Sequence, residues 1–175
     1  MLYHASNISG IKVLKPQIST HQKPYVYAIR SRLMAMLFGA PKDDFDLLID
    51  VQEGKPVLYE CYPDAFKSVY AGKSCSIYTV EEAGFLQGVA GWEEEWVCPN
   101  AVPVVQEEVV EDIYAQLMLA FQAGECIMHP FAQNEKYLAF IREELQERVE
   151  AFGISEEYRQ KDQRFVQYHN KLLSL

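Results

Sequence analysis

Short apolar segments separated by turn residues fill the first 105 residues, and this pattern limits the fold more than any other feature of the chain. The segments are rich in aromatic and β-branched residues, which favour strands, and Gly, Pro, Asn and Ser lie between them. Strands this short and this frequent predict two small antiparallel sheets packed together. The expected strands are Leu2–His4, Tyr25–Ala28, Leu47–Val51, Val57–Tyr62, Ser76–Val80 and Glu95–Cys98.

A turn and a short helix are also visible within this region. Residues 53–56, with the sequence Glu-Gly-Lys-Pro, separate two of the expected strands and predict a hairpin between them. Residues 30–38 are rich in Leu, Met and Ala, which have high helix propensity. Gly39 follows at the position where a left-handed C-terminal cap would lie, so we expect one helix from Arg30 to Phe38.

The sequence pattern changes after residue 105. Apolar residues recur at helical spacing between Val109 and Phe121 and form a wide apolar stripe. Glu107 and Glu108 lie at the start of this stripe, where the helix dipole favours negative charge. These features predict a helix that ends at Gly124.

A second helix is expected from Asn134 to Phe152, and Gly153 ends it. Ser155 is suited to cap a third helix. The sequence therefore predicts an α+β fold in which a β-rich core, residues 1–105, carries a helical C-terminal segment, residues 106–175. We expect this segment to pack on the core, so that the chain forms a single structural domain and offers its C-terminal helices to a protein partner.

The charge of the chain disfavours two classes of partner. Its formal net charge is −9, from 25 acidic and 16 basic residues. Binding to nucleic acid gains affinity from Lys and Arg side chains that displace counterions from the phosphates, and this chain is short of both. Anionic membranes are disfavoured for the same reason. A small-molecule ligand or a protein partner fits the composition better.

Compartment and metal content are also constrained by the sequence. The N-terminus turns polar within a few residues, no apolar run approaches the roughly 20 residues of a membrane span, and the cysteines form no C-x-x-C pair. We therefore expect a cytoplasmic protein with buried thiols. The histidines have no partners at zinc spacing, so no metal site is expected. The cysteines are Cys61, Cys75, Cys98 and Cys126, and the histidines are His4, His21, His129 and His169.

The residues suited to chemistry fall in three short segments, Leu2–Ser6, Tyr25–Ala28 and Glu94–Cys98. The second segment leads directly into the expected helix. Nucleotide and hydrolase signatures such as G-x-G-x-x-G, the Walker loop and G-x-S-x-G are absent from the sequence.

These three segments resemble the H-Y-E core of the ADP-ribosyltransferase superfamily, in its diphtheria-toxin-like and poly(ADP-ribose)-polymerase-like branch. In that family one strand carries Tyr-His-Gly followed by Ser or Thr, and a later strand carries Tyr followed by a small residue and a helix. A third strand opens with Glu before an aromatic and β-branched residues. His4, Tyr27 and Glu95 match the family histidine, tyrosine and glutamate. The resemblance covers residues 1 to about 105 and implies the split β core of the family.

The resemblance also implies that NAD is the substrate. Glu95 would be the catalytic residue, because a carboxylate beside the ribose stabilises the positive charge that develops as the nicotinamide bond breaks. Tyr27 would provide a flat platform for the nicotinamide ring, and His4 would hydrogen-bond a ribose hydroxyl of the adenosine half. The backbone of Ala5 would meet the carboxamide, and Ser6 belongs to the same cofactor-binding segment.

The chain departs from the family pattern at several positions. Ala5 replaces the usual glycine, which narrows the room for the backbone to approach a ligand. The family's helix serine lies further from its tyrosine than Ser31 lies from Tyr27, so either the loop is shorter here or Tyr25 is the cleft tyrosine. Both tyrosines project to the same strand face. The choice of glutamate within Glu93–Glu95 rests on the Trp-Val pair that follows.

Three functions follow from these observations. The first is an NAD-binding ADP-ribosyltransferase-like enzyme that transfers ADP-ribose to an unknown acceptor or hydrolyses NAD. The second is a catalytically silent protein-interaction module with the same fold. The third is an RNA 2′-phosphotransferase-like enzyme, which is the weakest alternative because no arginine stands next to His4 or Glu95 in the sequence.

Overall fold

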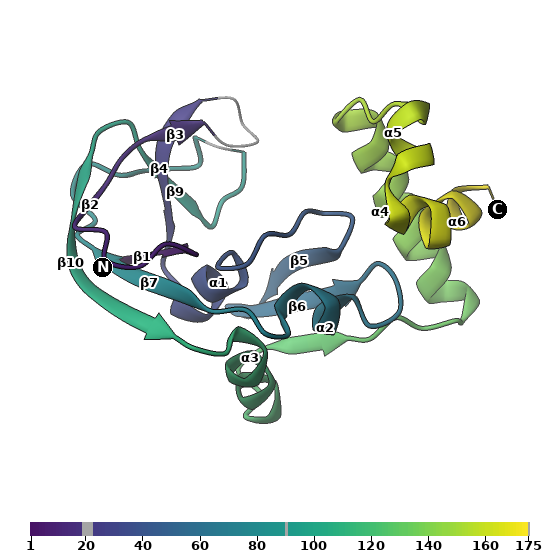
Figure 1. Ribbon diagram of the computed structural model, residues 1–175, viewed down its shortest axis with the longest axis horizontal. Coiled ribbons are helices and arrows are strands. Elements are labelled where there is room, and N and C mark those ends of the chain that lie inside the picture. The colour runs from purple at the N-terminus through teal and green to yellow at the C-terminus, as the bar shows by residue number, and fades with distance from the viewer. Residues whose placement is uncertain (19–22, 90, 175) are drawn as a thin grey trace. The chain divides into compact units, whose positions relative to one another are not determined.

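The computed structural model describes residues 1–18, 23–89 and 91–174, and it confirms a mixed α+β fold (Figure 1). In the described residues, the strands form one eight-stranded and one three-stranded sheet, and a helical segment follows at the C-terminal end. The chain divides into two compact units. Unit 1 comprises residues 1–41 and 70–119, and unit 2 comprises residues 42–69 and 120–175.

The larger sheet lies in unit 1, and all of its strand pairs are antiparallel within the described residues. Its strand order is β2-β10-β7-β1-β4-β9-β8, with β3 paired to β4 beside this path. The predicted strands of this unit are confirmed, with ends that differ by a few residues at most. The strands are β1 (Leu2–Ser6), β2 (Val13–Leu14), β3 (Gln17–Ile18), β4 (Pro24–Ile29), β7 (Cys75–Val80), β8 (Leu86–Gln87), β9 (Glu95–Cys98) and β10 (Val102–Val110).

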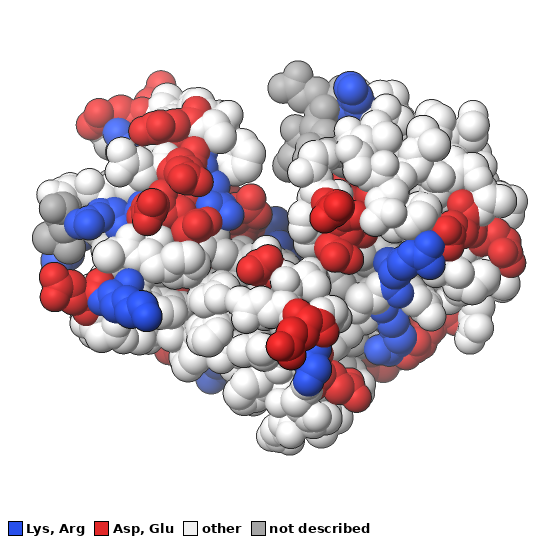
Figure 2. All heavy atoms as spheres, turned by 180° about the vertical axis from the view of Figure 1, so that it is seen from behind, with Lys and Arg blue, Asp and Glu red and all other residues white. Residues whose placement is uncertain are grey.

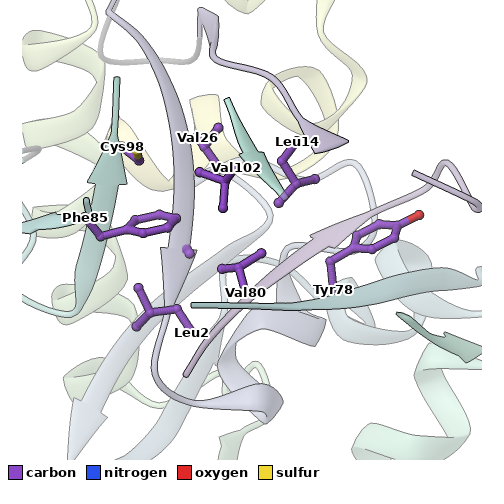
Figure 3. Close-up of a cluster of buried hydrophobic side chains, with 9 residues drawn as sticks. Leu2, Leu14, Val26, Tyr78, Val80, Phe85, Cys98 and Val102 are labelled. Carbon is purple, nitrogen blue, oxygen red and sulfur yellow. The ribbon is translucent and has the colours of Figure 1, made fainter. Parts of the chain in front are cut away.

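One face of this sheet carries a buried apolar cluster (Figure 3). Alternate residues of the central strands supply it, because successive side chains of a strand point to opposite faces. Ile29 and Ile77 alternate with its members and are buried as well. The helix α1 (Arg32–Leu37) packs against β1, β4 and β7. The cluster contains Leu2, Leu14, Val26, Ala28, Tyr78, Val80, Phe85, Cys98 and Val102.

The helix α1 is shorter than predicted, and its end differs from the prediction. It begins after Ser31, whose hydroxyl oxygen accepts a hydrogen bond from the Met34 N–H at 3.1 Å. Gly39 is absent from the residues with positive φ, so the predicted left-handed cap is wrong. A Cβ atom at this position would lie 2.6 Å from Cys75 Sγ. The glycine is therefore required by the close approach of the β7 side chain.

The prediction of a helix over residues 107–112 is wrong. Residues 107–110 continue β10, which pairs with β7 up to Val110, residues 111–112 belong to no helix or strand, and α3 (Ile113–Gln122) begins only afterwards. The register between β10 and β7 shifts between Val104 and Gln106, which indicates a β-bulge. Glu107 and Glu108 therefore lie on a strand, where they bind groups of the sheet and of α1.

Unit 2 contains the smaller sheet, in the order β11-β6-β5. The predicted hairpin is confirmed: β5 (Leu47–Gln52) and β6 (Lys55–Glu60) are joined by Glu53 and Gly54, which both have positive φ. Such values are typical of a type I′ turn, whose twist matches that of the strands. The strand β11 (Ile127–His129) joins β6 in parallel. The sequence did not predict this strand or the short helix α2 (Ala65–Tyr70).

The C-terminal helices agree with the prediction. The helix α4 (Glu135–Ala151) is capped by Asn134, whose side chain accepts a hydrogen bond from the Tyr137 N–H at 2.9 Å. Ser155 caps α5 (Glu156–Lys161) in the same way. A π-helical turn (Phe165–His169) and α6 (Asn170–Leu173) follow. Among the helices that the structure describes, none is both long and apolar enough to cross a membrane.

His169 and Arg164 tie these helices to the chain segment that precedes β5. The His169 Nε2–H donates to the Phe45 carbonyl at 2.9 Å, and the side chain is fully buried. Burial lowers the pKa of His169 to about 4, because the protonated ring would lose its hydration. Arg164 binds Asp43 and Asp162. Unit 2 thus contains a neutral histidine beside a network of ion pairs.

Candidate functional site

The strands β1 and β4 separate from each other at the position of His4. Within the described residues they pair only at Tyr3 and Ile29, whereas β1 pairs with β7 along its whole length. The His4 Nδ1 lies 2.7 Å from the carbonyl oxygen of Tyr27, 23 residues further along the chain. A side-chain hydrogen bond thus joins β1 to β4 at the point where their ladder stops.

This contact determines the tautomer of His4. A carbonyl oxygen only accepts hydrogen bonds, so Nδ1 carries the proton and donates it to Tyr27. Burial lowers the pKa of His4, and the bond to the Tyr27 carbonyl offsets this in part. A neutral ring with the proton on Nδ1 has a lone pair on Nε2. His4 can therefore accept a hydrogen bond from a ligand hydroxyl.

Tyr27 and Glu95 lie on one face of the sheet. In the β4–β9 register, Tyr27 is opposite Val97 and Ile29 is opposite Glu95, so these four residues share a face. The Tyr27 and Tyr25 rings contact each other edge to face, with centroids 6.1 Å apart. Both tyrosines and Glu95 are half-buried.

Glu95 is the diagonal neighbour of Tyr27 across β4 and β9. The pKa of Tyr27 is raised, first by burial and then by the negative charge of Glu95, with a smaller effect of Tyr25. The Tyr27 hydroxyl donates to the Lys23 carbonyl at 3.0 Å, which fixes the orientation of the ring. The Tyr27 ring and the Glu95 carboxylate thus give this sheet face a partly polar character next to the point where β1 and β4 stop pairing.

Ala5 and Ser6 have different environments. Ala5 alternates with His4, so it shares a face with Tyr3 and, through the β1–β4 register, with Ile29. The Ser6 hydroxyl oxygen accepts a hydrogen bond from the Ile8 N–H at 3.1 Å and shapes the turn after β1. Ala5 is placed toward the face of Tyr27, whereas Ser6 ends the strand.

The structure brings these residues together in two sets. Tyr25, Tyr27 and Glu95 share one face of the sheet with Ala5. His4 lies toward the opposite face, because it is the direct neighbour of Tyr78 across β1 and β7. The two sets meet at Tyr27, whose backbone carbonyl accepts a hydrogen bond from His4 and whose side chain shares a sheet face with Glu95.

Sequence reasoning missed two contributors to this region. Tyr78 is fully buried, and its ring centroid lies 6.4 Å from that of His4. The Arg30 guanidinium lies 4.6 Å from the centroid of the Trp96 ring and forms an ion pair with Glu82 at 2.7 Å. No local motif marks either residue, because both contacts depend on strand pairing.

The charged side chains are mixed on the surface. On the face that Figure 2 shows, Lys and Arg lie among Asp and Glu. Arg32 on α1 pairs with Glu108 on β10, as Arg30 pairs with Glu82. In the part of the chain that the structure describes, no group of three or more His, Cys, Asp and Glu side chains is arranged to hold a metal ion.

Comparisons with family models, with curated proteins and with solved structures gave no match to this chain.

Proposed function

We propose that the chain is an NAD-binding ADP-ribosyltransferase-like enzyme. The observation that carries this proposal is the placement of Tyr27 and Glu95 on one sheet face, joined through the Tyr27 backbone to His4. The same three residues match the histidine, tyrosine and glutamate of the family that the sequence resembles. The proposal therefore rests on the motif, on the shared face of Tyr27 and Glu95, and on the hydrogen bond that holds His4 to the Tyr27 backbone from the opposite face.

The proposed reaction breaks the bond between nicotinamide and ribose C1′. Nicotinamide leaves with the bonding electron pair, and positive charge develops on the ribose. The half-buried carboxylate of Glu95 would stabilise this charge more strongly than it could in water, because its surroundings are less polar. Water or a hydroxyl or amine of an acceptor then adds to C1′ and loses its proton.

The other residues would bind and orient NAD. The Tyr27 ring would stack on the nicotinamide, and the backbone of Ala5 on the same face would meet the carboxamide. The His4 Nε2 lone pair would accept a hydrogen bond from a ribose hydroxyl. Tyr25 supports the Tyr27 ring by edge-to-face contact.

NAD should raise the melting temperature of the protein, and Tyr27→Ala should abolish the rise. A ligand at about one hundred times its Kd adds about 2.7 kcal/mol, which is several degrees for a domain of this size. The measurement is a thermal melt of each protein with and without millimolar NAD. Tyr25→Ala removes only the edge-to-face support of the Tyr27 ring and should reduce the rise less than Tyr27→Ala does, whereas a larger loss in Tyr25→Ala would make Tyr25 the cleft tyrosine. Absence of a rise in the wild type would contradict NAD binding.

A further inference from the structure

A hydrogen-bond network joins β10 to the loop that follows β1. The Glu107 Oε1 accepts hydrogen bonds from the Gly10 N–H at 2.7 Å, from the Ser76 hydroxyl at 2.8 Å and from the Tyr78 hydroxyl at 3.1 Å. Gly10 and Glu107 are 97 residues apart in the chain. The Glu107 carboxylate on β10 therefore connects the loop to Ser76 and Tyr78 on the adjacent strand β7.

The same groups hold the rest of this loop, residues 8–11. The single Tyr78 hydroxyl proton is shared: it is donated mainly to the Ile8 carbonyl at 2.7 Å and more weakly to Glu107 Oε1 at 3.1 Å, while the Tyr78 oxygen accepts from the Ile11 N–H at 3.2 Å. The Ser76 hydroxyl lies 3.0 Å from the Ser9 hydroxyl. Each residue of the loop is thus bound to Glu107 or to a side chain that Glu107 binds.

Tyr78 connects this network to His4. The two residues are direct neighbours across β1 and β7, and their ring planes are inclined by 32°. Figure 3 shows Tyr78 as a member of the apolar cluster, with its hydroxyl directed away from the other members. Hydrogen bonds to its hydroxyl and full burial hold the Tyr78 ring in place, and its centroid lies 6.4 Å from that of the His4 ring.

We propose that Glu107 is a positioning residue for the candidate site: it fixes Tyr78 and the loop, and thereby keeps the His4 ring bonded to the Tyr27 carbonyl. The proposal rests on the NAD-binding function, in which His4 presents Nε2 to a ribose hydroxyl. The hydrogen bonds from Gly10 and Ser76 lower the pKa of Glu107, so the carboxylate is ionised and a strong acceptor at neutral pH.

The first test follows His4 in the ligand-free protein by nuclear magnetic resonance. In Glu107→Ala the His4 ring should gain access to water, so that its pKa rises toward the usual value and its Nδ1–H exchanges faster. Glu107→Gln keeps an oxygen acceptor and should restore most of the wild-type behaviour. Glu111→Ala removes an exposed glutamate just beyond the strand and should change nothing. Unchanged His4 signals in Glu107→Ala would overturn the proposal.

The second test measures NAD affinity in the same proteins. Glu107→Ala should weaken binding about tenfold, as expected when one hydrogen-bonded support is lost, whereas Glu107→Gln should stay close to the wild type. If Glu107→Ala does not fold, Tyr78→Phe keeps the ring but lacks the hydroxyl, and it should show a smaller change of His4 in the same direction. A wild type that fails to bind NAD would contradict the proposed function, while the His4 signals would still decide whether Glu107 positions the ring.

Discussion

Glu95→Gln is expected to lower the rate of nicotinamide release by about 100-fold or more, with the fold intact. Glutamine has nearly the same size as glutamate but no negative charge, so it cannot stabilise the cation that forms on the ribose. Binding of NAD in its ground state depends mainly on the Tyr27 ring and the Ala5 backbone. The melting shift with NAD should therefore persist in the variant, and the loss should fall on kcat rather than on KM.

The neighbouring glutamates provide matched controls for this prediction. Glu93 and Glu94 precede β9, and only Glu95 pairs with Ile29 on the face of Tyr27. Glu93→Gln and Glu94→Gln should keep nicotinamide release within a few-fold of the wild type. If Glu95→Gln releases nicotinamide at the wild-type rate, Glu95 is not the catalytic residue. If Glu93→Gln or Glu94→Gln shows the large loss instead, that glutamate is the catalytic residue.

Arg164→Met should destabilise unit 2 by about 3 to 5 kcal/mol, because it leaves partly buried carboxylates without their cation. The Arg164 guanidinium bonds Asp43 at 2.6 and 3.0 Å, Asp162 at 2.7 and 3.1 Å and Asp46 at 2.9 Å. Asp46 and Asp162 expose only 12% and 14% of their side chains. Little of these two carboxylates is therefore accessible to water that could replace Arg164. The measurement is the free energy of unfolding in urea at pH 7.

The control for this prediction is Lys161→Met. Lys161 pairs with Glu157 at a distance of 2.5 Å, but the two side chains are 73% and 77% exposed. Exposed pairs contribute about 1 kcal/mol at most, so the control should change stability far less. Equal stabilities of Arg164→Met and the wild type would show that the network contributes nothing.

The pH dependence of the Arg164 effect has a definite sign. The Arg164 guanidinium lowers the pKa of Asp162 well below the unfolded value of 3.8. A carboxyl group with a lowered folded pKa contributes stability above the unfolded pKa and loses it as the pH falls. The difference between wild type and Arg164→Met should therefore be constant near neutral pH and shrink below about pH 4.

Local signals in the sequence were sufficient for much of the fold. Asn134 and Ser155 are cap residues followed by helical periodicity, and they begin helices in the structure. Glu53 and Gly54 are a turn pair between two apolar runs, and they form the hairpin. In each case the interactions that decide the structure lie within a few residues of each other, so the pattern is visible without the rest of the chain.

The strand β10 shows where local signals fail. Its bulge near Val105 adds one residue to the strand, and this breaks the alternation of apolar and polar residues. The remaining apolar positions, Val109 and Val110, then match the helical spacing of the residues that follow. Pairing with β7, far away in the sequence, decides the outcome, and a window of neighbouring residues does not contain that information.

In the candidate site, too, local sequence signals predict one part and strand pairing decides the rest. The residue types and their order identified His4, Tyr27 and Glu95 as candidate site residues. The face of the sheet on which each one lies depends on the registers of β1, β4 and β9. The bond of His4 to the Tyr27 carbonyl depends on the pairing of β1 with β4, and the proximity of His4 to Tyr78 depends on the pairing of β1 with β7. The function of these residues remains a prediction, whereas the structure shows that Tyr27 and Glu95 share a face and that His4, on the opposite face, lies against the Tyr27 carbonyl.

The most direct test of the central claim is to map NAD binding by the amide signals of the isotope-labelled wild-type protein. We expect NAD to shift the signals of residues 3–6, 25–29 and 95–98 together, in one saturable process. Signals of α4 and α5 should stay unchanged. If NAD shifts no signals, or only signals outside these three segments, the assignment of an NAD site to His4, Tyr27 and Glu95 is contradicted.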